Sequence, residues 1–278
     1  MAHFSYDGQR LAYTVHGSGD RVTVLMPGLL LSQKMQAPLA RNLAKRGNRV
    51  ITFDPLGHGA SDRPRQMWRY SIAEFAKQAI ALLDHLKLDQ AIVGGTSLGA
   101  NISLEIAATA PERLRGMIIE MPALDNAIPA CAVAFTPLLY ALTFGEPVMR
   151  VLGRGARAVP RSHLPLLLDI GLDAIAQDPA PSGAVLQGIL FGRTAPEHKV
   201  RQTIETPAIV IGHQRDPVHP FSDADMLANE LPNARLINAN SIIELRTHPK
   251  RLTAKIADFV DDCWHEQPGE RRSRIASA

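Results

Sequence analysis

Residues 94–101, GGTSLGAN, place a single serine, Ser97, among glycines directly after the apolar run Ala91-Ile-Val93. Glycine has a high entropic cost and packs little, so three glycines within six positions need a structural reason. A strand that turns sharply into a helix supplies one, because small residues beside the turn let the two elements approach closely. Such a bend also lifts the serine hydroxyl out of the sheet. We therefore predict that Ser97 is a nucleophile on a strand-to-helix bend, the alternative being a glycine-rich structural turn.

The sequence on both sides of this bend alternates between strand and helix patterns. Most of the expected strands are continuous apolar runs, as for strands buried on both faces of a parallel sheet. They are Val22–Leu25, Val50–Phe53, Ala91–Val93, Met117–Ile119, Ala208–Ile211 and Leu236–Asn238. Two helical patterns are clear, one opened by the capping box Ser71-Ile-Ala-Glu74 and one ending at Cys263. The alternation predicts an α/β fold with a mostly parallel central sheet, helices on both faces and an antiparallel edge hairpin over residues 4–15.

The alternation stops between residues 124 and 193, where apolar clusters at helical spacing run without strand signals. We expect about four short helices there, forming a cap or lid inserted into a core made of residues 1–123 and 194–264. Residues 127–145 are uncharged over a length close to a membrane span. Because Pro129 and Pro137 interrupt them, we expect a kinked, buried or pocket-lining helix and no stable membrane insertion. The polar tail 265–278 is expected to be disordered.

Composition narrows the class of protein. The net charge of +3 is too small to suggest a nucleic-acid partner. The only cysteines, Cys131 and Cys263, both lie in apolar surroundings and form no disulfide or metal pattern. The first residues lack the basic and apolar regions of a signal peptide. We therefore expect a cytoplasmic protein that needs no metal and no cofactor.

A serine hydroxyl is a weak nucleophile until a base accepts its proton and a carboxylate orients that base. Asp216 follows the strand pattern at 208–211, and His248 follows the one at 236–238 and precedes the last helix. We predict these two residues as the acid and the base, in the chain order serine, acid, histidine. His213 and His219 flank Asp216, but they belong to the loop expected to supply the acid. The alternative for His248 is a helix-capping residue, and the rivals of Asp216 are Asp223, Asp225, Glu120 and Asp125.

The oxyanion of a tetrahedral intermediate needs two backbone N–H donors. We expect one from Leu98, directly after the serine. The other should be Leu29, in the loop after the first parallel strand, where Gly28 lets the chain turn towards Ser97.

These motifs resemble those of the α/β-hydrolase superfamily, in its lidded serine esterase and lipase branch. Asp54-Pro-Leu-Gly57-His-Gly59-Ala-Ser61-Asp-Arg-Pro64 resembles the turn D-x-x-G-x-G-x-S-x-x-P of that family, and residues 212–220 resemble its acid turn. The resemblance covers roughly residues 5–263. It implies the α/β-hydrolase fold and a Ser-His-Asp triad, but not a substrate. Two positions depart from the pattern: Pro27 stands where the family has histidine, and Thr247 precedes His248 where it has glycine.

Because the expected nucleophile is a serine, we do not expect the aspartate-dependent chemistry of the related dehalogenases and epoxide hydrolases in this protein. We expect a carboxylic-ester hydrolase for small to medium apolar esters, acting through an acyl-enzyme. The apolar group would be bound by lid residues, among them Phe135, Phe144 and Phe191. A C–C bond hydrolase, a cofactor-free haloperoxidase-like enzyme and a non-hydrolytic ligand receptor are the alternatives. The expected partner is a small-molecule ester, and a homodimer is left open.

Overall fold

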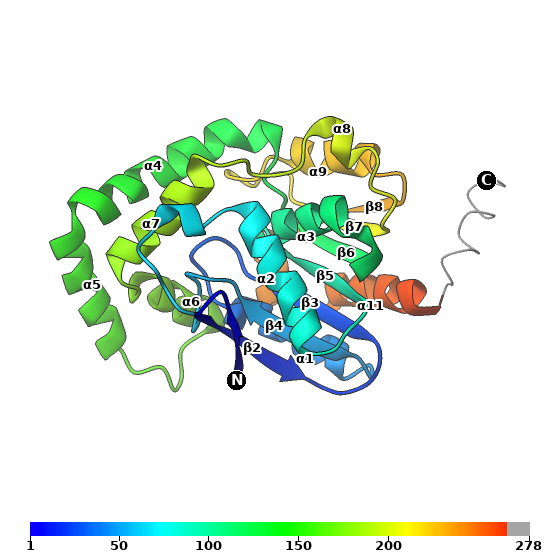
Figure 1. Cartoon of the computed structure of the whole chain (residues 1–278), viewed down its shortest axis with the longest axis horizontal. Helices are drawn as coiled ribbons and strands as arrows, with labels where there is room; N and C mark the ends of the chain where they lie inside the picture. Colours follow the sequence, from blue (N-terminus) through cyan, green and yellow to red (C-terminus); the bar gives the residue numbers. More distant parts are fainter. Residues whose placement is uncertain (266–278) are drawn as a thin grey trace.

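The computed structural model describes residues 1–265, so the expectation for the tail falls almost wholly outside the described residues. Eight strands form one sheet in the order β1-β2-β4-β3-β5-β6-β7-β8 (Figure 1). The strands are β1 (Ala2–Tyr6), β2 (Gln9–His16), β3 (Val22–Met26), β4 (Arg49–Asp54), β5 (Ala91–Thr96), β6 (Leu114–Glu120), β7 (Ala208–Gly212) and β8 (Ala234–Asn238). β1 and β2 pair antiparallel with each other and β2 pairs antiparallel with β4, whereas the other neighbours are parallel. The predicted parallel sheet with an edge hairpin is therefore confirmed.

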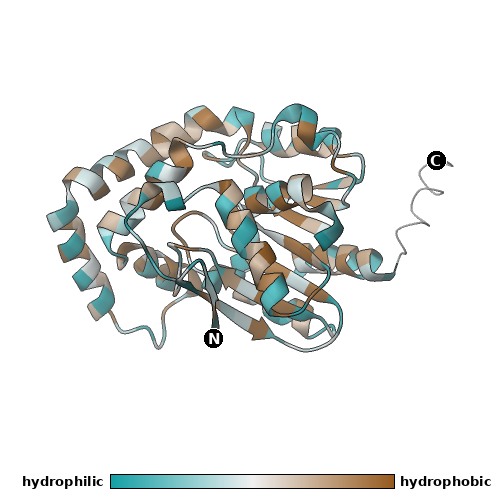
Figure 2. Cartoon of the chain, viewed as in Figure 1, coloured by the Kyte–Doolittle hydropathy of each residue, from teal (hydrophilic) through white to brown (hydrophobic). Residues whose placement is uncertain are grey.

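Helices cover both faces of this sheet. Side chains alternate between the two faces along a strand, so Val24 packs in one hydrophobic cluster and Leu25 in the other. The first cluster includes α2 (Ile72–His85), α3 (Leu98–Thr109) and α9 (Phe221–Glu230), and the second includes α1 (Ala37–Ala44) and α11 (Lys250–His265). Figure 2 shows the hydrophobic residues concentrated on the central strands between these layers. The N-cap expected for α2 is present, since Ser71 Oγ accepts a hydrogen bond from Glu74 N at 3.1 Å.

Short helical segments lie in the connections. They are η1 (Gln33–Gln36), η2 (Met67–Arg69), η3 (Pro111–Arg113), η4 (Asp125–Ala127), α8 (His198–Arg201) and α10 (Glu244–Thr247). η1 follows the loop after β3, and α10 lies between β8 and α11, so both stand near the carboxyl edge of the sheet.

Four helices lie between β6 and β7, in the segment where a lid was expected: α4 (Ile128–Phe144), α5 (Glu146–Ala158), α6 (Leu166–Ile175) and α7 (Pro179–Leu190). α7 is the most buried of them and packs against α4 and the core. α4 and α5 form the outer end of the molecule (Figure 1).

Residues Asp125–Phe144 form a helical segment that is long and apolar enough to cross a membrane, judged by length and composition alone. Only 11% of its most apolar window is buried. The expectation of a buried helix therefore holds for one side only: Leu142 is buried, whereas Val133, Tyr140 and Phe144 are exposed.

Candidate active site

Ser97 stands on the sharp bend between β5 and α3. Its backbone has φ +54° and ψ −105°, a left-handed conformation that is strained for a residue with a side chain. The neighbouring glycines are required by close packing. A Cβ atom on Gly95 would lie 2.3 Å from Met26 O, and one on Gly99 would lie 2.5 Å from the same oxygen. Strand, helix and the end of β3 thus converge at Ser97, which leaves its hydroxyl at the carboxyl edge of the sheet.

The loop between β7 and α9 brings both an imidazole and a carboxylate to this serine. Ser97 Oγ donates a hydrogen bond to His219 Nε2 at 2.8 Å, and His219 Nδ1 donates one to Asp216 Oδ2 at 3.0 Å. The direction of these bonds follows from an ionised carboxylate, which can only accept. The second carboxylate oxygen accepts from the backbone N–H groups of Val218 and His219, at 2.8 and 2.9 Å.

Asp216 is held in its ionised form. Burial raises the pKa of its carboxyl, but the hydrogen bonds from His219 and from the Val218 N–H outweigh burial and hold the pKa below its usual value. The side chain of Asp216 is only 5% exposed and that of His219 is 17% exposed. The carboxylate therefore fixes the imidazole with Nε2 directed at the serine.

The structure does not bring His248 to the serine. His248 follows the last residue of α10, is exposed, and has its Nδ1 3.0 Å from its neighbour Thr247 Oγ1. Pro249 O then accepts from Thr253 N at 2.8 Å in the first turn of α11. The expectation for His248 is corrected accordingly: the histidine in contact with Ser97 is His219, and the 247–249 segment connects two helices.

The sequence did contain a signal for His219. Asp216 and His219 are three residues apart in one loop, and the hydrogen bonds from the Val218 and His219 N–H groups to Asp216 fold that loop into a turn. A turn of this kind places both side chains on the same side. The chain order of the related family, in which acid and base come from different loops, favours His248 over His219, and the three-residue spacing within this loop is the signal that points to His219.

The two expected oxyanion donors lie in the expected elements. Leu98 is the first residue of α3, where a backbone N–H has no carbonyl partner one turn earlier in the helix. Leu29 follows Gly28 in the loop after β3, and a Cβ atom on Gly28 would lie 3.8 Å from Thr96 O. This loop therefore runs beside the bend that carries Ser97. The role of the Leu98 and Leu29 N–H groups as oxyanion donors stays a prediction.

A buried ionic cluster, which the sequence did not suggest, lies behind the bend. Arg246 and Glu120 form an ion pair with side chains only 4% exposed each. Thr96 Oγ1 donates to Glu120 and accepts from Arg246 Nη2 at 2.6 Å and from Gln36 Nε2 at 3.0 Å. The backbone carbonyl of Glu120 accepts from Ser97 N at 2.8 Å. The residues flanking the nucleophile are thus tied to β6, α10 and η1.

An apolar cavity of about 270 Å³ lies between α4, α7 and the start of the lid, lined by Ala123, Leu124, Ala127, Ile128, Cys131, Ala132, Thr136, Leu139, Leu190, Phe191 and Thr194. It lies near the triad. Cys131 Sγ is 4.0 Å from Val218 O, and burial together with the carboxylates of Asp223 and Asp216 raises the pKa of this thiol. Asn101, one turn after Ser97, donates to the carbonyls of Ala123 and Thr194 at 2.7 and 2.8 Å.

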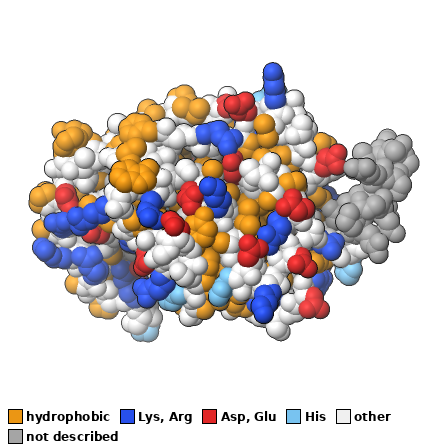
Figure 3. Space-filling view, viewed as in Figure 1, with side chains coloured by type: hydrophobic (Ala, Val, Ile, Leu, Met, Phe, Trp, Pro, Cys, Tyr) orange, Lys and Arg blue, Asp and Glu red, His pale blue; other side chains and the backbone are white. Residues whose placement is uncertain are grey.

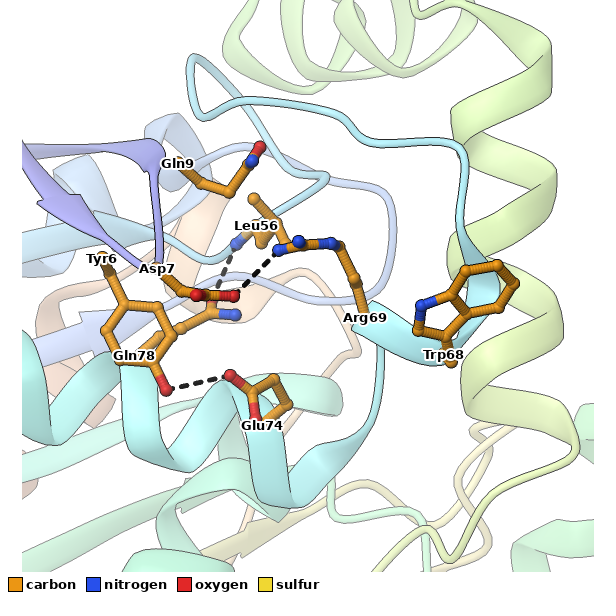
Figure 4. A pocket seen from close by; sticks show the side chains of 8 residues that line it. All are labelled: Tyr6, Asp7, Gln9, Leu56, Trp68, Arg69, Glu74 and Gln78. Carbon is orange, nitrogen blue, oxygen red and sulfur yellow. Dashed lines mark hydrogen bonds and ion pairs between the residues drawn. The ribbon is translucent and has the colours of Figure 1, made fainter.

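A second pocket, of about 260 Å³, lies at β1, η2 and α2 and is lined by none of the three triad residues (Figure 4). Its charged side chains and Tyr6 form two pairs: Tyr6 Oη donates to Glu74 at 2.9 Å, and Arg69 Nη1 donates to Asp7 at 3.0 Å. Within residues 1–265, no three His, Cys, Asp or Glu side chains are grouped so that they could hold a metal ion.

Comparison with known proteins agrees with this fold. A family model of the alpha/beta hydrolase fold matches residues 22–141. The chain is 28% identical over 214 residues to RutD of Pseudomonas savastanoi pv. phaseolicola, which is provisionally named a carbamate hydrolase. That match covers 75% of this chain and 79% of RutD. Serine hydrolase BPHL of Mus musculus is 24% identical over 241 residues, or 84% of this chain and 77% of BPHL.

Among solved structures, the enol-lactonase from Burkholderia xenovorans LB400 superposes with a TM-score of 0.77 at 22% identity, over 94% of this chain and 100% of that one. This likeness concerns the fold. The chain therefore has the α/β-hydrolase fold, and its named relatives support a hydrolase.

Proposed function

We propose that this protein is a serine hydrolase that cleaves carboxylic esters through a triad of Ser97, His219 and Asp216. The observation that carries the proposal is the continuous path of hydrogen bonds from Ser97 Oγ through the imidazole to the buried carboxylate, at 2.8 and 3.0 Å. A nucleophile, a base and an orienting acid in this arrangement are what acyl transfer requires.

The reaction would proceed in two halves. His219 Nε2 accepts the Ser97 proton as Oγ attacks the acyl carbon, and the N–H groups of Leu98 and Leu29 would stabilise the oxyanion. The imidazolium returns its proton to the leaving alcohol, which departs as the acyl-enzyme forms. His219 then deprotonates a water molecule that attacks the acyl carbon, and Ser97 recovers its proton as the acid leaves. Asp216 keeps Nε2 facing the serine throughout.

The apolar cavity supports a substrate with an apolar acyl or alcohol group, because most of its lining offers only carbon atoms. The names of two structural neighbours are compatible with cleavage of an ester bond. Besides the enol-lactonase, the solved structures include Est816, titled an N-acyl homoserine lactone degrading enzyme, and lactones are cyclic esters. A C–C bond hydrolase is the second candidate, since a meta-cleavage product hydrolase is also among the structural neighbours.

Labelling with a fluorophosphonate probe tests the nucleophile. The wild-type protein should be labelled at Ser97, and Ser97→Ala should not be labelled although it folds normally. Turnover of p-nitrophenyl esters of graded chain length then tests the bond type. If the labelled enzyme hydrolyses none of these esters, the ester proposal fails and the C–C candidate takes its place. If Ser97 does not react, a non-hydrolytic receptor is favoured instead.

A further inference from the structure

The outer side of the lid carries an apolar stripe that no described residue covers. On α4 this stripe follows positions 133, 137, 140 and 144, the spacing of one helix face. Val133 is 78% exposed, Tyr140 66% and Phe144 71%, and the last two rings lie with centroids 4.7 Å apart and planes tilted by 43°. The opposite side of α4 packs inward at Leu142 and lines the apolar cavity at Leu139.

The stripe continues onto α5, where Val148, Val151 and Leu152 are 64%, 61% and 52% exposed. We call the exposed apolar residues 133–152 on these two helices the α4–α5 face. The side of α5 that packs on the molecule carries the buried Gly153 and Ala156. Figure 3 shows hydrophobic side chains along this end of the molecule. Soluble monomeric proteins rarely expose large contiguous apolar surfaces, and such surfaces mark sites that bind a protein, a ligand or a membrane.

A row of arginines borders the apolar residues on α5. Arg150, Arg154 and Arg157 are spaced four and three residues apart, and all three are exposed. Between residues 127 and 168 the only acidic residue is Glu146, which pairs with Arg150 at 2.5 Å. Arg157 donates to the neutral carbonyl of Ala176. Within residues 1–265, neither Arg154 nor Arg157 forms an ion pair, so the border of the face keeps its positive charge.

We propose that the α4–α5 face binds the surface of an anionic phospholipid bilayer. A helix pair with exposed Phe, Tyr and Val on one side and arginines beside them fits the boundary between acyl chains and charged headgroups. The helices lie in this boundary and do not span the bilayer, because the inner side of α4 remains packed on the core. This inference concerns the location of the protein and does not depend on the bond it cleaves.

Charge favours a lipid surface over a second copy of the chain. In a symmetric dimer the same patch occurs on both subunits, so a two-fold contact through this face would bring the arginine rows towards each other. The face offers no unpaired carboxylate to neutralise them. Anionic headgroups would neutralise both rows without that conflict.

Co-sedimentation of the whole chain with vesicles tests the proposal. The wild type should bind vesicles of phosphatidylcholine mixed with phosphatidylglycerol, and bind phosphatidylcholine alone more weakly. Arg154→Gln should weaken binding to the anionic vesicles about fivefold. Val148→Ser combined with Val151→Ser should weaken it about tenfold. Added salt should weaken wild-type binding as well.

The controls are the same substitutions elsewhere on the surface, Val15→Ser and Arg10→Gln, which should bind as the wild type does. Circular dichroism checks that every variant is folded. The proposal is overturned if the wild type binds neither vesicle, if it binds both equally, or if the face variants bind unchanged. It is also overturned if light scattering shows a wild-type dimer that the Val148/Val151 variant dissociates, because a second copy then covers the face.

Discussion

His219 and His248 differ in a single respect that matters for catalysis, the contact with Ser97 Oγ. We expect His219→Ala to lower kcat/KM on a p-nitrophenyl ester by at least about 10³-fold, because no other group accepts the serine proton. His248→Ala, the matched control, should stay within about twofold of the wild type. The rate of fluorophosphonate labelling should follow the same pattern. Near-normal turnover in His219→Ala together with loss of turnover in His248→Ala would restore the base expected from chain order.

A third histidine, His58, is expected to make stability depend on pH. It is fully buried, its Nδ1 contacts Leu56 O at 3.0 Å, and burial lowers its pKa from 6.5 to about 4. The folded state therefore favours neutral imidazole, so the stabilising contribution is present above pH 6.5 and is lost as the pH falls towards 4. The loss amounts to about 1.4 kcal/mol per pH unit in that window. Urea unfolding of His58→Gln should show a correspondingly shallower pH dependence, and an identical slope would contradict this account.

At the level of single residues, the sequence predicted the position of Ser97 because the glycines that permit the bend are themselves visible. Asp216 was predicted from its place after a strand, and the structure sets it beside an imidazole. The choice of imidazole could not be made from order along the chain. It depends on which loop folds back over the bend, and that is decided by the turn at Asp216.

Among the elements, the Arg246–Glu120 pair joins α10 to β6, and Thr96 of β5 hydrogen-bonds to both side chains. Arg246→Met should lower the free energy of unfolding by about 3–5 kcal/mol, because it leaves a buried carboxylate unpaired. Removing both charges with Arg246→Met and Glu120→Leu should recover a large part of that loss. Guanidinium unfolding of the two variants measures the difference. A double variant no more stable than the single one would show that the charges act independently.

The lid helix α4 gives a test of the apolar cavity. Leu139 lines the cavity, whereas the adjacent Leu138 packs against the core without lining it. Leu139→Ala should shift the preferred p-nitrophenyl ester to a longer chain while turnover of the acetate changes little. Leu138→Ala should leave the preference where it is and lower the melting temperature. If both variants shift the preference equally, the cavity is not where the apolar group binds.

Periodicity could not tell which side of α4 faces inward. Residues 128–144 are apolar almost all round, so the sequence has no polar side to mark the solvent. The amphipathic α2 and α11, in contrast, each have apolar residues on one stripe, and this stripe indicates their buried side from the sequence.

Across the whole molecule, alternation of strand and helix was enough to predict the sheet and its two covering layers, since continuous apolar strands must be buried on both sides. How residues 124–127 attach to this core was not predictable, because part of that attachment is made by one buried carboxylate. That carboxylate belongs to Asp223, which lies in the first turn of α9. It is also fully buried against the first residues of the lid.

The Asp223 carboxylate holds residues 124–127 against α9, the helix that follows the loop of Asp216 and His219. It accepts hydrogen bonds from Leu124 N at 2.7 Å, from Asn126 N and Nδ2 at 3.0 and 2.9 Å, and from Ala127 N at 3.0 Å. Because α9 directly follows the loop of Asp216 and His219, this carboxylate links the start of the lid to the base. An amide in its place has one accepting oxygen, and its NH₂ group would face N–H donors.

We therefore expect Asp223→Asn to lower stability by about 3 kcal/mol. The melting temperature should fall by about 5–10 °C, and limited proteolysis should cut sooner around residues 124–127. Asp225→Asn changes an exposed carboxylate on the same helix and should alter neither quantity measurably. Differential scanning calorimetry measures the melting temperature of each variant, and a proteolysis time course measures the rate of cleavage around residues 124–127. Equal melting temperatures for the two variants would mean that the lid is held by its apolar contacts with α7 and the core rather than by this carboxylate.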